Sequence, residues 1–330
     1  IANPNGITCE GCGFINIPNA TLTTGQVQLG TNAAGQGGSI TGVNVTQGVV
    51  IVNGKGMDAS GVNQLDILSR SAQINANIWA GNNNPATNGG NNSTQLNVIL
   101  GVNQIATDGN GSAAPSGNPT ITNSNTANST VAAPTVALDV SNLGGMYAGA
   151  IRLIGTEAGL GVNSAGAIQA SSSHLQLSNN GTVSFSSSAN TQAKTDLTLT
   201  ATQGNLSNAG SIVAGGNASI QASDANNTAG NITNSGSLYA QGNIAMTANA
   251  TSGTVNNTGF IGAQGNTTVN TAQFIQSAAG TLAAGVAIDG KLGTEGTATM
   301  RRRAVLERTV EAAEAVFDVL LAEAHLFKRL

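Results

Sequence analysis

The sequence is poor in charged and aromatic side chains. Only 8% of its 330 residues are Asp, Glu, Lys or Arg and only 3% are Phe, Trp or Tyr, whereas 44 residues are Gly. A globular enzyme of this length normally carries more of both kinds, so the composition argues against that class. The formal net charge of −4 is too small to imply a nucleic-acid partner or electrostatic attachment to a membrane surface.

Long apolar runs and the common catalytic motifs are also missing. No apolar run reaches the length of about 18 residues that a transmembrane helix needs. The sequence has no Gly-x-Ser-x-Gly, no phosphate-binding loop and no His-Glu-x-x-His, so no catalytic residue and no cofactor are predicted. Asp58 and Asp66 are expected to cap turns rather than to form a catalytic pair, and His174 is expected to face solvent.

A phrase of nine residues returns three times between residues 196 and 290. Its Asn-x-Gly element recurs after 26 residues, from Asn208 to Asn234, and then after 23, at Asn257. Such a period is typical of a solenoid, in which each repeat packs only on its neighbours. The three copies are Gly204-Asn-Leu-Ser-Asn-Ala-Gly-Ser-Ile212, Gly230-Asn-Ile-Thr-Asn-Ser-Gly-Ser-Leu238 and Gly253-Thr-Val-Asn-Asn-Thr-Gly-Phe-Ile261.

Within each repeat, apolar residues alternate with small or polar ones, as in Ser237-Leu-Tyr-Ala240. This period of two predicts short strands with one face directed inward. Asn and Gly separate the strands, and both tolerate positive φ, so we expect the chain to turn there. The predicted fold is all-β, a right-handed parallel β-helix with three short strands per coil. Asparagines at stacked corners are expected to hydrogen-bond to one another.

Two segments leave the regular pattern. Residues 81–135 are polar and hold prolines at 85, 115, 119 and 134. We predict polar loop excursions there, around one hairpin formed by residues 96–105. Residues 65–70 are compatible with a strand or with a helix, and the sequence does not decide between them.

Residues 301–330 differ from everything before them. They contain no Gly or Asn, yet they hold six of the eleven basic and five of the fifteen acidic residues. Apolar residues at spacings of three and four predict a short C-terminal amphipathic α-helix. Two explanations stay open, a native helix that caps the open end of the solenoid and a non-native tail from frameshift or fusion. The abrupt change in composition favours the second.

A tight turn is predicted for Asn3-Pro-Asn-Gly-Ile7. Pro4 fixes φ at the second position of the turn, and Gly6 accepts a left-handed conformation. The segment Thr8-Cys-Glu-Gly-Cys-Gly-Phe-Ile-Asn16 follows directly. Together the two segments closely resemble the motif in the secretion domain of two-partner secretion exoproteins. This is the filamentous haemagglutinin family, which includes the contact-dependent growth inhibition exoproteins.

The resemblance continues further along the chain and covers about residues 1–160. The repeats in 161–300 look like the haemagglutinin repeats of the same family. The family's domain begins further upstream, so the chain is expected to be a fragment, the C-terminal part of a secretion domain with its first repeats. The additional matching segments are Ala20-Thr-Leu-Thr-Thr-Gly25, Gly54-Lys-Gly-Met-Asp-Ala-Ser60, Leu65-Asp-Ile-Leu-Ser-Arg70 with the residues up to Trp79, and Leu143-Gly-Gly-Met-Tyr-Ala148 with the residues up to Glu157.

The resemblance implies export by a dedicated outer-membrane transporter of the Omp85 type, followed by folding of the β-helix outside the cell. It implies a secreted or surface-displayed bacterial protein, either an adhesin or haemagglutinin or the stalk of a contact-dependent inhibition protein. Host-cell glycans or receptors on neighbouring cells would be further partners. The secretion-motif residues would be Asn3, Pro4, Asn5, Gly6 and Ile7, and a purely structural role in a turn is compatible with this assignment.

An enzyme that degrades polysaccharides is the alternative function on the same fold. It requires clustered charged side chains on one wall of the β-helix. The first 300 residues hold 5 basic and 10 acidic residues, and these are scattered mostly singly along the sequence. The distribution therefore favours a non-enzymatic protein.

Cys9 and Cys12 admit three interpretations. A zinc site needs four ligands, and only His174 and His325 could add to the two thiols, so no metal site is predicted. A thioredoxin-like redox pair needs a strand-to-helix setting, which the sequence lacks. A local disulfide in a secreted protein is the favoured interpretation.

Overall fold

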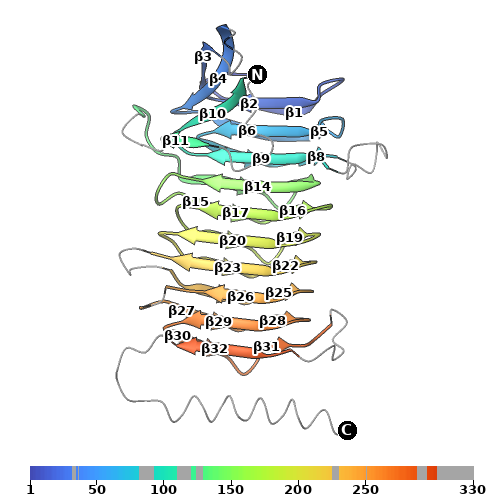
Figure 1. Cartoon of the computed structure of the whole chain (residues 1–330), viewed down its shortest axis with the longest axis vertical. Helices are drawn as coiled ribbons and strands as arrows, with labels where there is room; N and C mark the ends of the chain where they lie inside the picture. The colour runs from blue at the N-terminus through green and yellow to red at the C-terminus, as the bar shows by residue number, and fades with distance from the viewer. Residues whose placement is uncertain are drawn as a thin grey trace.

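The computed structural model describes residues 1–31, 35, 37–81, 93–109, 120–123, 129–224, 230–249, 251–287 and 296–302. Over these ranges it contains strands and no helix. The strands wind into a parallel β-helix whose coils stack along the long axis of the molecule (Figure 1). The predicted all-β solenoid is confirmed. Most of the predicted C-terminal helix lies outside the described residues, but Arg301 and Arg302 belong to the last strand and not to a helix.

One wall of the β-helix is a ten-stranded parallel sheet to which every coil contributes a strand. Its strands follow the order of the chain from the first coil to the last. They are β2 (Asn19–Thr23), β6 (Gln64–Ser69), β9 (Gln95–Leu100), β14 (Ala150–Gly155), β17 (Leu175–Asn179), β20 (Leu197–Thr202), β23 (Ala218–Ser223), β26 (Ile244–Thr247), β29 (Thr267–Thr271) and β32 (Ala298–Arg302).

The rest of each coil belongs to an 18-stranded sheet that consists of two parallel ladders joined through the long strands β1 and β5. From β12 onward each coil therefore has three short strands, as predicted. The members of this sheet are β1 (Ile7–Gly13), β5 (Val49–Ala59), β7 (Ser71–Ile74), β8 (Asn77–Ala80), β12 (Val136–Val140), β13 (Gly145–Ala148), β15 (Gly161–Ser164), β16 (Ala167–Ala170), β18 (Val183–Phe185), β19 (Asn190–Ala193), β21 (Leu206–Asn208), β22 (Ser211–Ala214), β24 (Ile232–Asn234), β25 (Ser237–Ala240), β27 (Thr254–Asn257), β28 (Phe260–Ala263), β30 (Gln273–Gln276) and β31 (Thr281–Ala284).

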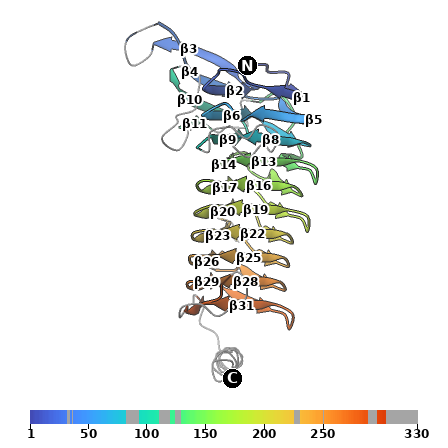
Figure 2. The same cartoon turned by 90° about the vertical axis from the view of Figure 1, so that its right-hand side faces the viewer.

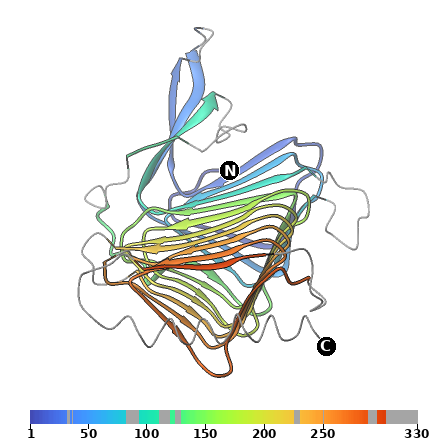
Figure 3. The ribbon, with the colours of Figure 1, turned by 60° about the horizontal axis from the view of Figure 1, so that its bottom comes forward.

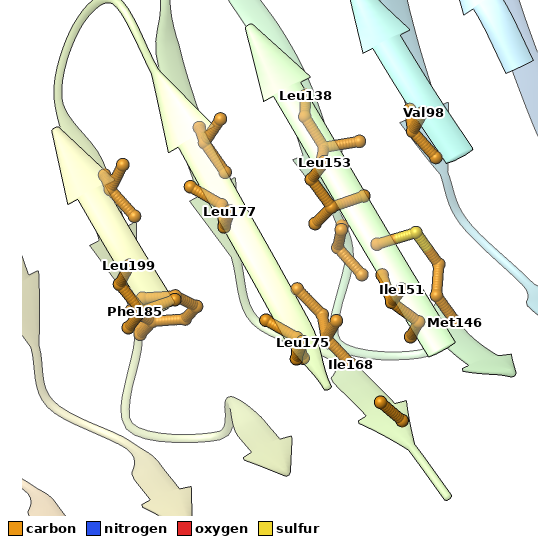
Figure 4. Packing of buried hydrophobic residues seen from close by; sticks show 14 of the residues in the cluster. Val98, Leu138, Met146, Ile151, Leu153, Ile168, Leu175, Leu177, Phe185 and Leu199 are labelled. Atoms are coloured by element: carbon orange, nitrogen blue, oxygen red, sulfur yellow. The ribbon is translucent and has the colours of Figure 1, made fainter. Parts of the chain in front are cut away.

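The core is a column of aliphatic side chains enclosed by the walls. Leu153, Leu177 and Leu199 are register partners on successive coils, and each is at most 2% exposed. Figure 4 shows them in line with one another, with Phe185 and Ile168 of the opposite wall nearby. A single coil leaves this column open above and below, and only the next coil covers it, so stability arises from coil-on-coil contact.

Thr191 interrupts the aliphatic column. It stands on β19 between its register partners Ile168 and Ile212, is fully buried, and its hydroxyl has no hydrogen-bond partner. Burial of an unpaired hydroxyl is costly, so Thr191→Val is expected to raise the free energy of unfolding by about 1–2 kcal/mol. Urea denaturation measures the change. The outward-facing Thr200→Val serves as control and should shift the midpoint little, and a destabilised Thr191→Val variant would contradict the assignment.

A ladder of buried asparagines lines one corner of the repeats. Asn208, Asn234 and Asn257 are register partners and at most 3% exposed. Asn208 Nδ2 donates to Asn234 Oδ1 at 2.8 Å, and Asn234 Nδ2 donates to Asn257 Oδ1 at 2.9 Å. Asn257 Nδ2 donates to the backbone oxygen of Thr281 at 2.9 Å. The predicted asparagine ladder is therefore confirmed, and it satisfies side-chain amides that would be expensive to bury alone.

The glycines beside this ladder are required for a reason that differs from the predicted one. None of Gly210, Gly236 and Gly259 has positive φ. A Cβ atom on Gly236 would instead collide with the backbone oxygen of Gly210, and one on Gly259 with that of Gly236. The expectation of left-handed turns was wrong here. Coils about 4.8 Å apart leave no space for a side chain at this corner.

A smaller antiparallel sheet lies outside the coil stack near its N-terminal end, and Figures 1 and 3 show it projecting from the stack. Leu68 and Ile99 on the outer face of the ten-stranded sheet form a buried cluster with Val43, Val45 and Ile105 of the smaller sheet. This cluster fixes the smaller sheet to the wall. Its strands, in spatial order, are β11 (Ile121–Asn123), β10 (Asn103–Gly109), β4 (Gly37–Val45) and β3 (Gln26–Thr31).

The predicted hairpin at residues 96–105 was wrong. β9 runs inside the ten-stranded sheet between β6 and β14, whereas β10 leaves the stack and pairs with β4 and β11. Both faces of β9 are buried, because Leu96 and Val98 face the core and Ile99 faces the outer cluster. Residues 65–69 belong to strand β6 and Arg70 follows it, so no helix forms there. The other excursions predicted in 81–135 fall largely on 82–92, 110–119 and 124–128, outside the described residues.

Candidate functional site

The candidate secretion motif forms a tight turn at the start of the first coil. Gly6 N donates to the backbone oxygen of Asn3 at 3.0 Å, and Asn5 N donates to Asn3 Oδ1 at 3.1 Å. Gly6 has φ of 120°, which a residue with a side chain rarely adopts. The predicted turn is therefore present, with its two hydrogen bonds closed by Asn3.

Hydrogen bonds hold the turn against the end of β2 and against the residues that precede β5. Asn3 N donates to the backbone oxygen of Thr23 at 2.9 Å, and the Gln47 side chain donates to that of Pro4 at 3.2 Å. Gly48 lets the turn approach, because a Cβ there would lie 2.8 Å from the Pro4 oxygen. Ile7 is half-buried and begins β1 opposite Val50. The backbone of the turn is thus held in one place.

The side chains of the turn divide into two groups. Asn3 and Asn5 are exposed, whereas Pro4, Gly6 and Ile7 are half-buried. The half-buried residues shape the turn and attach it to the β-helix, and so does Asn3, whose side-chain oxygen accepts from Asn5 N and whose backbone bonds to Gly6 and Thr23. The side chain of Asn5 is exposed to solvent. The structure therefore shows which residues of the motif build the turn and leaves Asn5 as its most outward polar side chain.

Cys9 and Cys12 stand at the corner of the first coil, directly after the turn. Their sulfur atoms are joined in a disulfide, with a Cα–Cα distance of 5.4 Å, and Gly11 between them has φ of 83°. Cys9 is buried and pairs with Val52 of the next coil. The described residues contain no group of three or more His, Cys, Asp or Glu side chains placed to hold a metal ion.

A buried ion pair that the sequence did not point to joins distant parts of the chain. Arg70 Nε donates to Glu157 Oε2 at 3.1 Å and Arg70 Nη2 to Glu157 Oε1 at 2.8 Å, and the two side chains are 5% and 3% exposed. Arg70 Nη1 also donates to Ser129 Oγ at 2.8 Å and to the backbone oxygen of Val131 at 2.7 Å. This guanidinium therefore fixes both a coil end and the segment that returns to the stack.

The ion pair spans an intermediate coil, since Arg70 follows β6, Glu157 follows β14, and β9 lies between these strands. Gly101 ends the intermediate strand with φ of 113°, and a Cβ there would lie 2.5 Å from Thr156 Oγ1. Thr156 Oγ1 in turn donates to Asn103 Oδ1 at 2.6 Å. Gly101 thus leaves room for the Thr156–Glu157 backbone beside it.

The two aspartates considered for catalysis lie on different walls. Asp58 Oδ1 accepts hydrogen bonds from Ser60 N at 3.0 Å and Ser60 Oγ at 2.7 Å, so it does cap a turn. Asp66 does not, because it lies fully buried in the middle of β6. Its carboxylate accepts from Gln64 Nε2 at 2.9 Å and from Asn97 Nδ2 at 2.8 Å. The turn assignment of Asp66 was wrong, since the outer face of β6 is covered here.

Other polar and aromatic groups serve the wall itself. His174 is half-buried rather than fully exposed, and its Nδ1 lies 3.2 Å from Ser173 Oγ. Trp79 and Tyr147 stack on adjacent coils with ring centroids 4.3 Å apart, and burial raises the pKa of Tyr147. Arg152 Nε donates to Gln176 Oε1 at 3.3 Å, and burial lowers the pKa of Arg152.

Two hollows in the described residues contain few charged side chains. A surface hollow of about 390 Å³ beside β23 and β26 contains one charged residue, Asp224, among its lining side chains. A second, of about 10 Å³, lies in the core beside Asn208 and Asn234 and has only apolar side chains and Thr233 around them.

In the part of the chain that the structure describes, no helix is long and apolar enough to cross a membrane.

Comparison with known proteins identifies the region around the turn. The family model described as TPS secretion domain matches residues 1–185. The protein named Toxin CdiA from Yersinia pestis is 44% identical over 181 residues, which are 55% of this chain and 5% of that protein. The protein named tRNA nuclease CdiA from Escherichia coli is 34% identical over 222 residues, which are 67% of this chain and 6% of that protein.

A third relative, named 16S rRNA endonuclease CdiA, from Enterobacter cloacae subsp. cloacae, is 38% identical over 203 residues, or 60% of this chain and 5% of that protein. The crystal structure of the filamentous hemagglutinin secretion domain aligns with a TM-score of 0.42 and 18% identity, over 91% of this chain and 65% of that one. The chain spans only about one-twentieth of the length of its curated relatives. Since the family model covers more than half of its 330 residues, the chain belongs to the TPS secretion domain family.

Proposed function

We propose that this chain is the export and folding segment of a large two-partner secretion exoprotein. An outer-membrane transporter of the Omp85 type recognises the turn of residues 3–7, the chain passes through in an unfolded state, and the β-helix forms outside. The observation that supports this proposal best is the turn itself, which presents Asn3 and Asn5 to solvent on a fixed backbone. TPS exoproteins are secreted and displayed on the bacterial cell surface, which is the location of this chain.

The composition suits passage as an unfolded chain. Only 8% of the residues are charged and 3% aromatic, so few groups resist transfer through a narrow channel. Neighbouring coils then supply the stabilising contacts, for example through the Ser184–Ser207 hydroxyl pair at 2.7 Å. A stack with nearest-neighbour energetics can grow one coil at a time as the chain emerges.

The proposed role is non-enzymatic. The matched family is a secretion domain, and the ion pair of Arg70 and Glu157 is enclosed rather than open to a substrate. Relatives whose names include nuclease activity share only 5–6% of their length with this chain. We therefore place any toxic activity of the parent exoprotein outside residues 1–330 and assign this segment to its stalk. Carriage of an adhesin or haemagglutinin, with host-cell glycans or neighbouring-cell receptors as targets, is the alternative.

Asn5→Ala in the full-length exoprotein, co-produced with its transporter, tests recognition by the turn. Asn5 is exposed, so the substitution should leave the thermal melting of the purified chain unchanged. Loss of one or two hydrogen bonds to the transporter is expected to reduce the exported amount about tenfold. Asn163→Ala, at an exposed asparagine of β15 in the same family region, is the matched control. Export of Asn5→Ala at the wild-type level would contradict the proposal.

A further inference from the structure

Strand β3 forms one edge of the small sheet outside the coil stack. Within the described residues its only neighbouring strand is β4, so one side of its backbone is unpaired. Figure 2 shows β3 and β4 extending away from the axis of the stack. An edge strand of this kind presents a row of N–H and C=O groups to which another strand can add.

Charged side chains and proline, two of the usual protections of a sheet edge, are missing from β3, although its pairing with β4 has register shifts after Gln28 and after Gly30. Natural edge strands are commonly blocked by Lys, by Pro or by a covering segment. The sequence Gln26-Val-Gln-Leu-Gly-Thr31 contains neither charge nor Pro, and no charged residue occurs between Glu10 and Lys55. Strands β3 and β4 therefore carry no charged side chain that would repel the same strands of a second copy.

β3 also carries exposed apolar side chains. Val27 and Leu29 are 40% and 68% exposed, and because they are two residues apart they lie on one face of the strand. Val27 is the register partner of Val43, which belongs to the buried cluster that fixes the small sheet to the wall. Among the described residues, the exposed apolar face therefore extends beyond the buried cluster on the same side of the small sheet.

We propose that β3 pairs with β3 of a second copy of this chain, antiparallel and about a two-fold axis. The strand is self-complementary in this arrangement. With Gln28 opposite Gln28 of the second copy, Val27 lies opposite Leu29 of that copy on the same face. Two four-stranded sheets then become one eight-stranded sheet, and the apolar side chains of both edges cover one another. The interface is small, so the association depends on concentration.

Sedimentation equilibrium over a concentration series of the purified chain measures this association. The wild-type chain is expected to shift from monomer to dimer as concentration rises. Leu29→Lys places two like charges at the paired edge and is expected to lower the association constant at least about tenfold. Leu143→Lys is the matched control, because Leu143 is 82% exposed in the turn between β12 and β13, away from β3. It should leave the association constant unchanged.

A mixture of Leu29→Lys and Leu29→Glu chains provides a rescue experiment. Opposite charges at the paired edges should restore association to near the wild-type value, which a local folding defect would not allow. A wild-type chain that stays monomeric at every concentration would overturn the proposal. This holds even if β3 pairs with a strand of another protein, because the proposed partner is a second copy of this chain. Association of Leu29→Lys at wild-type strength would also overturn it, because the dimer would then use another surface.

Discussion

Replacement of Glu157 by alanine is expected to lower the free energy of unfolding of the N-terminal coils by about 3–5 kcal/mol. The substitution leaves Arg70 buried with its charge uncompensated, since the guanidinium is 5% exposed and bonded to both carboxylate oxygens of Glu157. Urea denaturation followed by tryptophan fluorescence measures the loss. Trp79 is the only tryptophan in the sequence, and its stacking on Tyr147 places the probe in the affected coils.

Two further variants distinguish the effect of breaking the Arg70–Glu157 ion pair from the effect of removing any side chain. Glu10→Ala removes an exposed carboxylate from β1 and should change the free energy of unfolding by no more than about 0.5 kcal/mol. The double variant Arg70→Met with Glu157→Leu replaces both partners by apolar groups and should recover most of the lost stability. If Glu157→Ala unfolds at the wild-type urea concentration, the pair does not hold these coils together.

Gly236→Ala is expected to destabilise the repeats around it by about 3 kcal/mol or more. The new Cβ would collide with the backbone oxygen of Gly210 in the preceding coil. The Cβ is fixed to one backbone and the oxygen belongs to another, so neither atom can move without shifting a coil. Hydrogen exchange should show faster amide opening in β22, β25 and β28, with little change in β6 and β9, because a solenoid transmits strain mainly to its neighbours.

Gly161→Ala is the matched control for this substitution. Gly161 is the first residue of β15, and the atom nearest to a Cβ added there is the Thr182 oxygen at an ordinary 3.6 Å. We expect exchange rates close to those of the wild type. Equal effects of the two substitutions would show that loss of glycine flexibility, rather than close approach of the coils, determines the corner.

The fold was predictable because its cause is local and repeated. Alternation within Ser237-Leu-Tyr-Ala240 predicts a strand wherever it occurs, and the spacing of Asn208, Asn234 and Asn257 fixes the coil length. The same spacing predicts the amide ladder, since equivalent residues in adjacent coils must stack. In a regular repeat, the period of the sequence therefore shows which residues contact one another in adjacent coils.

The features that the sequence did not reveal depend on the irregular part. Arg70 and Glu157 are 87 residues apart, and excursions of different lengths lie between them, so no period relates the two positions. Asp66 and Ile99 are buried on the outer face of the ten-stranded sheet, where alternation alone predicts exposure. The small outer sheet and the segments covering that face change the burial pattern, and they are attached through contacts that sequence spacing does not encode.

The turn of residues 3–7 was placed correctly by its own residue types, Pro4 and Gly6. The contacts of the turn required the structure, because the sequence does not show that Asn3, Thr23 and Gln47 hold it in place. The exposed Asn5 remains as the group whose substitution tests recognition with least effect on folding.

The most direct test of the stacked parallel coils is a distance measured on chain recovered outside the cell after export. Asn163, Ser184, Ser207, Thr233 and Asn256 are successive register partners over five coils. Nitroxide labels are attached at Asn163→Cys and Asn256→Cys, and electron–electron double resonance measures the distance between them. A narrow distribution centred at about 19 Å is expected, which is four coil spacings of about 4.8 Å. A broad distribution, or a maximum well beyond about 30 Å, would contradict in-register parallel stacking, in which four coil spacings fix the separation.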